Sequence, residues 1–99
     1  MKFSKKEYRN MLVDLVNSCE RKYGFLTTSL LTTECISCIY NFNKEDYNLV
    51  LGLSVLVLRD LEVAGVIRNN GSVYQLVMGF EPNKFYDKED KENEEELGA

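Results

Sequence analysis

The sequence predicts a mainly α-helical domain that carries one small β-hairpin. Three observations predict this class. Apolar residues recur every three or four positions early in the chain, a long apolar segment follows a capping pattern at Asn43, and Asn69-Asn70-Gly71 separates two short alternating runs. The 99 residues suffice for one domain, which we place at residues 1–86. The charged and polar residues 87–99 predict a disordered acidic tail.

The first helix is expected from about Lys5 to Lys22. Ser4 and Glu7 have the spacing of a capping box, in which each side chain accepts a hydrogen bond from the other residue's amide. One apolar stripe at helical spacing follows, and it consists of Tyr8, Met11, Leu12, Leu15, Val16, Cys19 and Tyr23. Gly24 is expected to end the helix, because glycine enters the left-handed conformation without steric cost.

A second helix is expected from Leu30 or Thr33 to Asn41, with Thr32 or Thr33 as its N-cap. The residues at helical spacing are Leu31, Cys35, Cys38, Ile39 and Phe42. A strand is the alternative here, because Thr, Ile and Tyr are frequent in this segment. The preceding residues 25–28 predict either a brief strand or an extended linker.

The third helix is expected to begin after Asn43 and to stop at Gly65. Apolar residues cover nearly its whole circumference, which indicates burial on more than one side. A chain of this length has few elements to cover such a helix, so either the C-terminal segment or a second copy must do so. Closed two-fold pairs are the commonest oligomers, and we predict a homodimer. The residues expected at its interface are Val50, Leu51 and Val57.

Charge is unevenly distributed along the chain. Residues 1–83 contain nine Lys or Arg and nine Asp or Glu, whereas residues 84–99 contain three and seven and account for the net charge of −4. No apolar run approaches the roughly 20 residues of a membrane span. The N-terminus lacks the apolar core of a signal peptide. These features predict a cytoplasmic protein without a membrane segment, in the nucleoid or in a host cell if it is viral.

The residue inventory predicts no enzyme. Histidine, the usual general base and metal ligand, is absent, and no glycine-rich phosphate loop is found. Cys35 and Cys38 have C-x-x-C spacing, and Cys19 is a third cysteine. Core packing is the favoured interpretation of all three, with a redox pair or a metal site as alternatives. We therefore expect no catalytic residue, no metal and no cofactor.

The segment Leu58-x-x-Leu61-Glu62-x-x-Gly65-x-Ile67, together with the order of elements, resembles the winged helix-turn-helix family. The resemblance covers about residues 5–77 and implies a winged helix-like fold of three helices plus a wing. It implies that Ile67 opens the first wing strand and that Asn69-Asn70-Gly71 forms the wing tip. An unrelated α+β domain, in which a helix is also followed by a hairpin, is the alternative.

The resemblance further implies a small DNA-binding transcriptional regulator that acts as a homodimer on double-stranded DNA. The DNA contacts that it suggests are Lys5, Lys6, Arg9, Lys44, Asn48, Ser54, Arg68, Asn69 and Asn70. The side chains also favour a different partner, because the front of the third helix is apolar and acidic while base reading needs polar or basic groups. The alternative is a non-catalytic protein–protein interaction module, such as a viral or mobile-element accessory protein that binds or inhibits a host protein.

Overall fold

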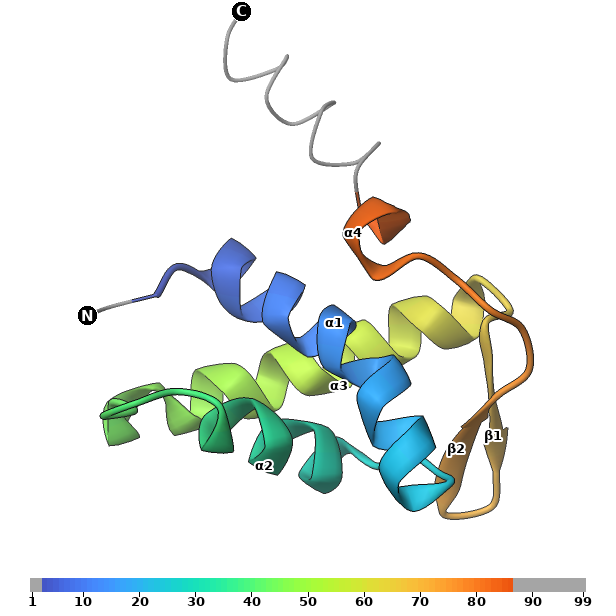
Figure 1. The fold of residues 1–99 in the computed structure, drawn as a ribbon, viewed down its shortest axis with the longest axis horizontal. Coiled ribbons are helices and arrows are strands. Elements are labelled where there is room, and N and C mark those ends of the chain that lie inside the picture. The colour runs from blue at the N-terminus through green and yellow to red at the C-terminus, as the bar shows by residue number, and fades with distance from the viewer. Residues whose placement is uncertain (1–2, 87–99) are drawn as a thin grey trace, which may run out of the picture.

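The computed structural model describes residues 3–86, and the predicted tail at 87–99 lies outside the described residues. The helices are α1 (Lys5–Tyr23), α2 (Thr28–Ser37), α3 (Tyr47–Val63) and α4 (Pro82–Phe85), and a 3-10 turn η1 (Lys44–Asp46) precedes α3. Strands β1 (Ile67–Asn70) and β2 (Val73–Leu76) form an antiparallel hairpin. Figure 1 shows the hairpin at the end of α3 where that helix stops. The predicted class, mainly α with one hairpin, is confirmed.

Helix α1 begins and ends where local chemistry dictates. The Ser4 hydroxyl accepts from the Glu7 amide at 3.1 Å, and the Glu7 carboxylate accepts from the Ser4 amide at 3.0 Å, so the predicted capping box is confirmed. Gly24 follows the helix at φ 79°, and its N–H donates to the Glu20 carbonyl. The stripe that α1 buries consists of Tyr8, Leu12, Val13, Val16 and Cys19.

Helix α2 begins earlier than predicted. Thr27 is the N-cap, because its backbone is extended and its hydroxyl accepts from the Leu30 amide at 3.0 Å. The predicted cap Thr32 lies inside the helix and is buried. The helix also stops at Ser37, and Asn41, the predicted end, has a left-handed φ of 54°. The segment contains four threonines, and the extended backbone and the hydroxyl hydrogen bond together identify Thr27 as the cap.

The segment before α2 forms a single bridge to the hairpin. Leu26 and Tyr74 exchange two backbone hydrogen bonds, each 2.8 Å long. Leu26 is fully buried at this point. The predicted brief strand or linker is thus an extended residue that ties the α1–α2 connection to β2.

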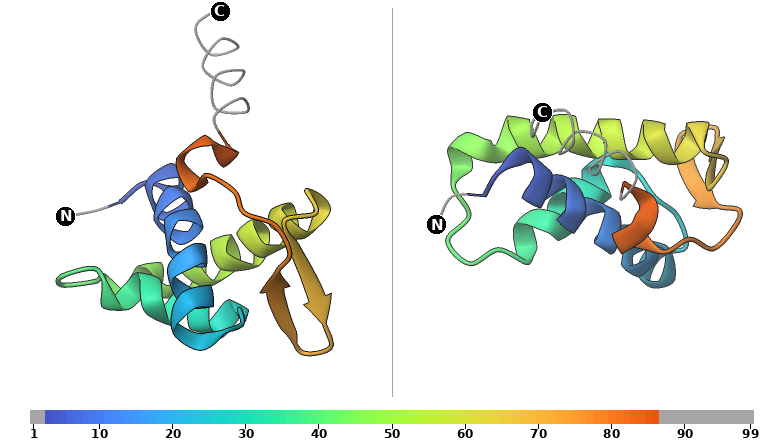
Figure 2. Two further views of the ribbon diagram at one scale, coloured as in Figure 1. Left: turned by 45° about the vertical axis from the view of Figure 1, so that its right-hand side comes forward. Right: turned by 90° about the horizontal axis from the view of Figure 1, so that it is seen from above.

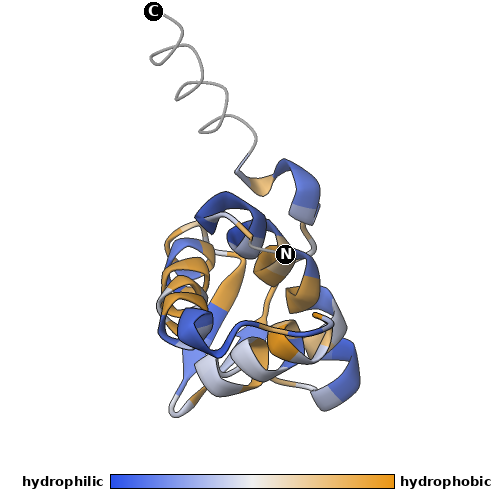
Figure 3. Ribbon diagram, turned by 90° about the vertical axis from the view of Figure 1, so that its left-hand side faces the viewer, coloured by the Kyte–Doolittle hydropathy of each residue, from blue (hydrophilic) through white to orange (hydrophobic). Residues whose placement is uncertain are grey.

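Helix α3 packs against both α1 and α2. Seen from above, α3 lies along one side of the molecule, and α1 and α2 lie together on the other (Figure 2, right). Hydrophobic residues occupy much of this helix, which is at the left of Figure 3. Its inner stripe consists of Val50, Ser54, Val57, Leu58 and Leu61, all buried.

The predicted dimer contacts of Val50 and Val57 are wrong, because both side chains are 0 % exposed within a single chain. They pack in the core with α1 and α2. Leu51, the third predicted contact, is half-buried and borders the exposed side of α3. A helix that is apolar all round therefore has one stripe in the core and a different stripe at the surface.

Helix α3 passes into the hairpin through a Schellman motif. Gly65 has a φ of 79°, its N–H donates to the Glu62 carbonyl at 3.0 Å, and the Val66 N–H donates to the Leu61 carbonyl at 2.9 Å. Leu61 and Val66 are both buried, as the hydrophobic contact of this motif requires. Ile67 then opens β1 at 2 % exposure, as predicted.

The hairpin turn differs from the predicted one. Asn70 pairs with Val73, so the two turn residues are Gly71 and Ser72, and Asn69 belongs to β1. Gly71 has a φ of 81°. A glycine at the first of two central positions is typical of a type II′ hairpin turn, which matches the twist of the flanking strands.

The chain remains in contact with the core up to Tyr86. Tyr86 is 6 % exposed, its hydroxyl donates to Asp60 at 2.7 Å, and the Arg9 guanidinium lies 4.0 Å from its ring centroid. The short helix α4 was not predicted. Its first residue is Pro82, whose fixed φ suits the start of a helix.

Replacing Gly65 with alanine is expected to lower the free energy of unfolding by about 1–2 kcal/mol, because a side chain disfavours the left-handed conformation. Gly52→Ala is the matched control. Gly52 lies inside α3 with open space where a Cβ would be, so alanine should raise the stability of a single chain by about 0.5–1 kcal/mol. Urea unfolding of each variant in dilute solution measures both changes in the free energy of unfolding. Shifts of the same sign would contradict the backbone role of Gly65.

Candidate functional site

One stripe of α3 faces away from the other helices. Its exposed residues recur every three or four positions, and we define the outer face of α3 as Asn48, Leu51, Gly52, Val55, Arg59 and Glu62. Leu51 is half-buried and the other five are exposed. The exposure of Val55 is 53 %, which is high for a valine in the middle of a helix that forms the core on its other side.

Polarity changes along the outer face. Leu51, Gly52 and Val55 form an apolar centre, with Asn48 on the N-terminal side and two charged residues, Arg59 and Glu62, on the C-terminal side. An apolar centre inside a polar rim is the usual composition of a protein–protein contact surface. The outer face therefore has an apolar centre that is open to solvent between two polar ends.

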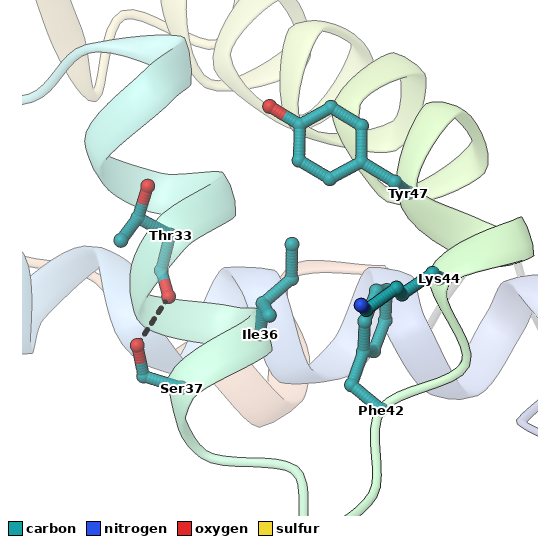
Figure 4. Close-up of a pocket in the computed structure, with 6 residues that line it drawn as sticks. All are labelled: Thr33, Ile36, Ser37, Phe42, Lys44 and Tyr47. Carbon is teal, nitrogen blue, oxygen red and sulfur yellow. Dashed lines mark hydrogen bonds between the residues drawn. The ribbon is translucent and has the colours of Figure 1, made fainter.

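A groove lies between α2 and the start of α3, and Tyr47 in its lining is one turn before Leu51 of the outer face. Its volume is about 700 Å³, and its lining residues are Thr33, Ile36, Ser37, Phe42, Lys44 and Tyr47. Figure 4 shows Ile36 and Tyr47 on opposite sides of the space between the two helices, with Lys44 beside Phe42. The Ser37 hydroxyl donates to the Thr33 carbonyl at 2.8 Å, so this polar group is satisfied within α2. The groove thus offers mainly apolar contact.

The predicted DNA contact at Ser54 is wrong. Ser54 is 0 % exposed, and its hydroxyl donates to the Val50 carbonyl at 2.9 Å. The Thr32 hydroxyl lies 2.8 Å from the Ser54 hydroxyl and 2.8 Å from the Thr28 carbonyl. This buried polar pair joins α2 to α3, and a side chain in that position cannot reach a base edge.

The cations predicted on α1 lie in its first two turns. Lys5 and Lys6 are exposed in the first turn of α1, whereas Arg9 is partly buried and covers the ring of Tyr86. The Tyr8 hydroxyl donates to Asp46 at 2.7 Å, which joins this part of α1 to η1. The first turn of α1 therefore lies towards the start of α3, whereas Arg9 lies with Tyr86 and Asp60 beside the C-terminal half of α3.

The other predicted DNA contacts are divided between the two ends of α3. Lys44 and Asn48 are exposed at its start, and Arg68 and Asn69 are exposed on β1 beyond its far end. Asn70, also exposed, donates to the Gln75 side chain at 3.4 Å. A helix of 17 residues is about 25 Å long, so the structure does not bring the two groups together.

Three acidic side chains accept hydrogen bonds from tyrosine hydroxyls, which engages these carboxylates within the fold. They join Tyr8 to Asp46, Tyr23 to Glu34, and Tyr86 to Asp60. Burial and the bond to Asp46 raise the pKa of Tyr8 to about 12. Hydrogen bonds from Tyr23 and Lys22 lower the pKa of Glu34. These carboxylates hold elements together, and sequence spacing alone did not signal any of the three pairs.

The cysteines are all free, and two of them are buried. Burial raises the pKa of Cys19 and of Cys35 to about 11, so both thiols stay protonated at neutral pH. Cys38 is exposed at the end of α2.

Among residues 3–86, no group of three or more His, Cys, Asp or Glu side chains is placed to hold a metal ion. Within the same residues, no helix is long and apolar enough to cross a membrane.

Comparisons of the chain with protein families, with curated proteins and with solved structures find no match. Function is therefore inferred from the outer face of α3, the groove at the start of that helix and the charged groups around them.

The Tyr23–Glu34 bond predicts an acid-sensitive contribution to stability. Because folding lowers the pKa of Glu34 below its ordinary value of 4.5, the contribution is fully present above that value and is lost as pH falls through the lowered pKa. Glu34→Gln should therefore be less stable than the wild type at neutral pH, with the difference shrinking in acid. Urea midpoints measured across this range test it, and Tyr23→Phe should reproduce the effect. A difference that does not depend on pH would refute this linkage.

Proposed function

We propose that this chain is a non-catalytic protein–protein interaction domain of the winged-helix type, which binds its partner through the outer face of α3. The observation that carries the proposal is the exposed apolar centre at Leu51, Gly52 and Val55 on a helix whose opposite stripe is already buried. The element order, the passage at Gly65 and the Leu26–Tyr74 bridge support the winged-helix assignment.

Single exposed apolar side chains are common at protein surfaces and need no explanation. Here Leu51 and Val55 follow one another at helical spacing, and Tyr47, which lines the groove, lies one turn before Leu51 on the same helix. Removing such surface from water contributes about 25 cal/mol per Å². A partner that covers the centre of the face and part of the groove would gain this energy without rearranging the core.

The outer face is poorly suited to reading DNA bases. Base edges are recognised by side chains that donate or accept hydrogen bonds. Over the first three turns of α3, Asn48 is the one outer-face residue with such a side chain, because Leu51, Gly52 and Val55 occupy the rest. At the start of the helix, the positive charge of Lys44 is opposed by the neighbouring Glu45. A protein partner fits this chemistry better than a nucleic acid.

A homodimeric DNA-binding regulator is the second candidate, and the exposed hairpin favours it. Arg68 and Asn69 project from β1, where a wing would contact phosphates, and Lys5 and Lys6 add cations on α1. This candidate needs contacts that reach the phosphate backbone from both ends of α3.

Photo-crosslinking can test the proposed surface directly. A photoreactive amino acid is placed at Val55 and, as a matched control, at Val77, which lies outside α3 with a similar exposure of 51 %. In cells that produce the chain naturally, illumination should attach a second polypeptide at position 55 and none at position 77. The absence of any adduct at position 55 would overturn the proposal.

A salt titration on random-sequence duplex DNA tests the second candidate. We expect no binding at physiological salt, because the nine Lys or Arg of residues 1–83 are balanced by nine Asp or Glu. If the second candidate is correct, binding should appear at low salt, and Arg68→Gln should reduce the slope of log affinity against log salt by about one. Ser72→Ala, an uncharged change in the hairpin turn outside the suggested contacts, is the control and should leave the slope unchanged. Tight binding that Arg68→Gln weakens would replace our proposal.

A further inference from the structure

We propose that the partner is a second copy of this chain, docked through the outer face of α3 as an antiparallel two-fold pair centred between Gly52 and Val55. This inference rests on the function proposed above and names the occupant of the same surface. Gly52, the spacing of outer-face residues on either side of it and the placement of the charges support it.

Nothing within one chain requires a glycine at position 52. Its backbone φ is not in the left-handed region, unlike that of Gly65, and no atom lies within 4 Å of the place where a Cβ would be. A glycine inside a helix costs about 0.5–1 kcal/mol relative to alanine. Close approach of another backbone or side chain is the reason for a glycine that remains at such a position. Gly52 lies at the apolar centre of the outer face, where a docked helix would approach most closely.

The spacing along the outer face is self-complementary when the two helices run in opposite directions. In a two-fold pair the same patch meets itself with its order reversed. With the centre placed between Gly52 and Val55, Val55 of the partner copy lies over Gly52 and fills the space that the missing side chain leaves. Arg59 of the partner copy then lies opposite Asn48, a side-chain acceptor for its guanidinium.

Charge placement selects the antiparallel direction. Lys44 precedes the N-terminal end of α3 and Glu62 lies near its C-terminal end, at similar distances from the centre. An antiparallel pair brings Lys44 of each copy near Glu62 of the other, at both ends of the contact. A parallel pair would place Lys44 against Lys44 and Arg59 against Arg59, which is unfavourable. Of the two acids beside Lys44, Asp46 is hydrogen-bonded to Tyr8 in its own chain, whereas Glu45 is exposed and partly offsets the attraction between Lys44 and Glu62 of the other copy.

The size of the contact predicts a reversible dimer. One helix face from each copy buries less than the roughly 1,200 Å² at which stable interfaces begin, and interfaces below that size are weak or transient. Monomer and dimer should therefore exchange, with the proportion of dimer rising with protein concentration.

Sedimentation of the full 99-residue chain over a range of concentrations tests the dimer. The wild type should shift from monomer to dimer, and Val55→Glu should raise the dissociation constant at least about tenfold, because each dimer would bury two unpaired carboxylates. Val77→Glu is the matched control and should leave the constant unchanged. Gly52→Ala should weaken the dimer although it stabilises the single chain, a combination that a defect in folding would not produce. Circular dichroism confirms that each variant is folded.

A charge exchange tests the direction. Lys44→Glu and Glu62→Lys should each weaken the dimer several-fold, and the double variant should recover most of the loss. Failure of the double variant to recover would overturn the antiparallel register. A chain that stays monomeric at every concentration, or a dimer that Val55→Glu does not affect, would overturn the inference as a whole. In either case, an adduct of a different polypeptide at position 55 would still support the proposed function, whereas the absence of any adduct there would overturn that function too.

Discussion

The passage from α3 into the hairpin at Gly65 is the constraint on which the arrangement of the other elements depends. The left-handed glycine lets the Val66 N–H return to the Leu61 carbonyl, which fixes where β1 leaves the helix. The hairpin then holds the α1–α2 connection through Leu26, and the Val77 N–H donates to the Val66 carbonyl as the chain turns back towards α4. One local backbone motif thus coordinates segments that are far apart in the sequence.

Hydrogen bonds from three tyrosines also hold the helices in position relative to one another. Tyr8 ties α1 to the start of α3, Tyr23 ties α1 to α2, and Tyr86 ties the end of the described chain to α3. Each bond is directed, so it fixes the position of one helix against another, which apolar packing alone leaves free to slide. The acids in these bonds are engaged within the fold. The outer face of α3 takes no part in these bonds and remains available to a partner.

The two sides of α3 differ in what covers them. Its inner stripe is filled by contacts with α1 and α2, and a second apolar stripe centred on Gly52 and Val55 remains in solvent. The second stripe does not contribute to the stability of a single chain. The exposed glycine inside the helix lowers the stability of the helix relative to alanine. Both features are consistent with a surface that is covered when the protein works.

The sequence by itself determined those features that depend on neighbours within a few residues. The cap at Ser4 and Glu7, the stops at Gly24 and Gly65 and the start of β1 were predicted because local hydrogen bonds and backbone preferences decide them. Tertiary structure decided which threonine caps α2 and which two residues turn the hairpin, because several candidates had equal local propensity.

Tertiary packing alone also decided which residues of α3 are buried. Val50, Ser54 and Val57 fill the core while Val55 remains exposed, although all four lie within two turns of one helix. Periodicity cannot select among positions on a helix that is apolar all round, since every stripe has the same pattern. The selection is made by the direction from which α1 and α2 approach, and that direction is set by contacts between residues distant in the sequence.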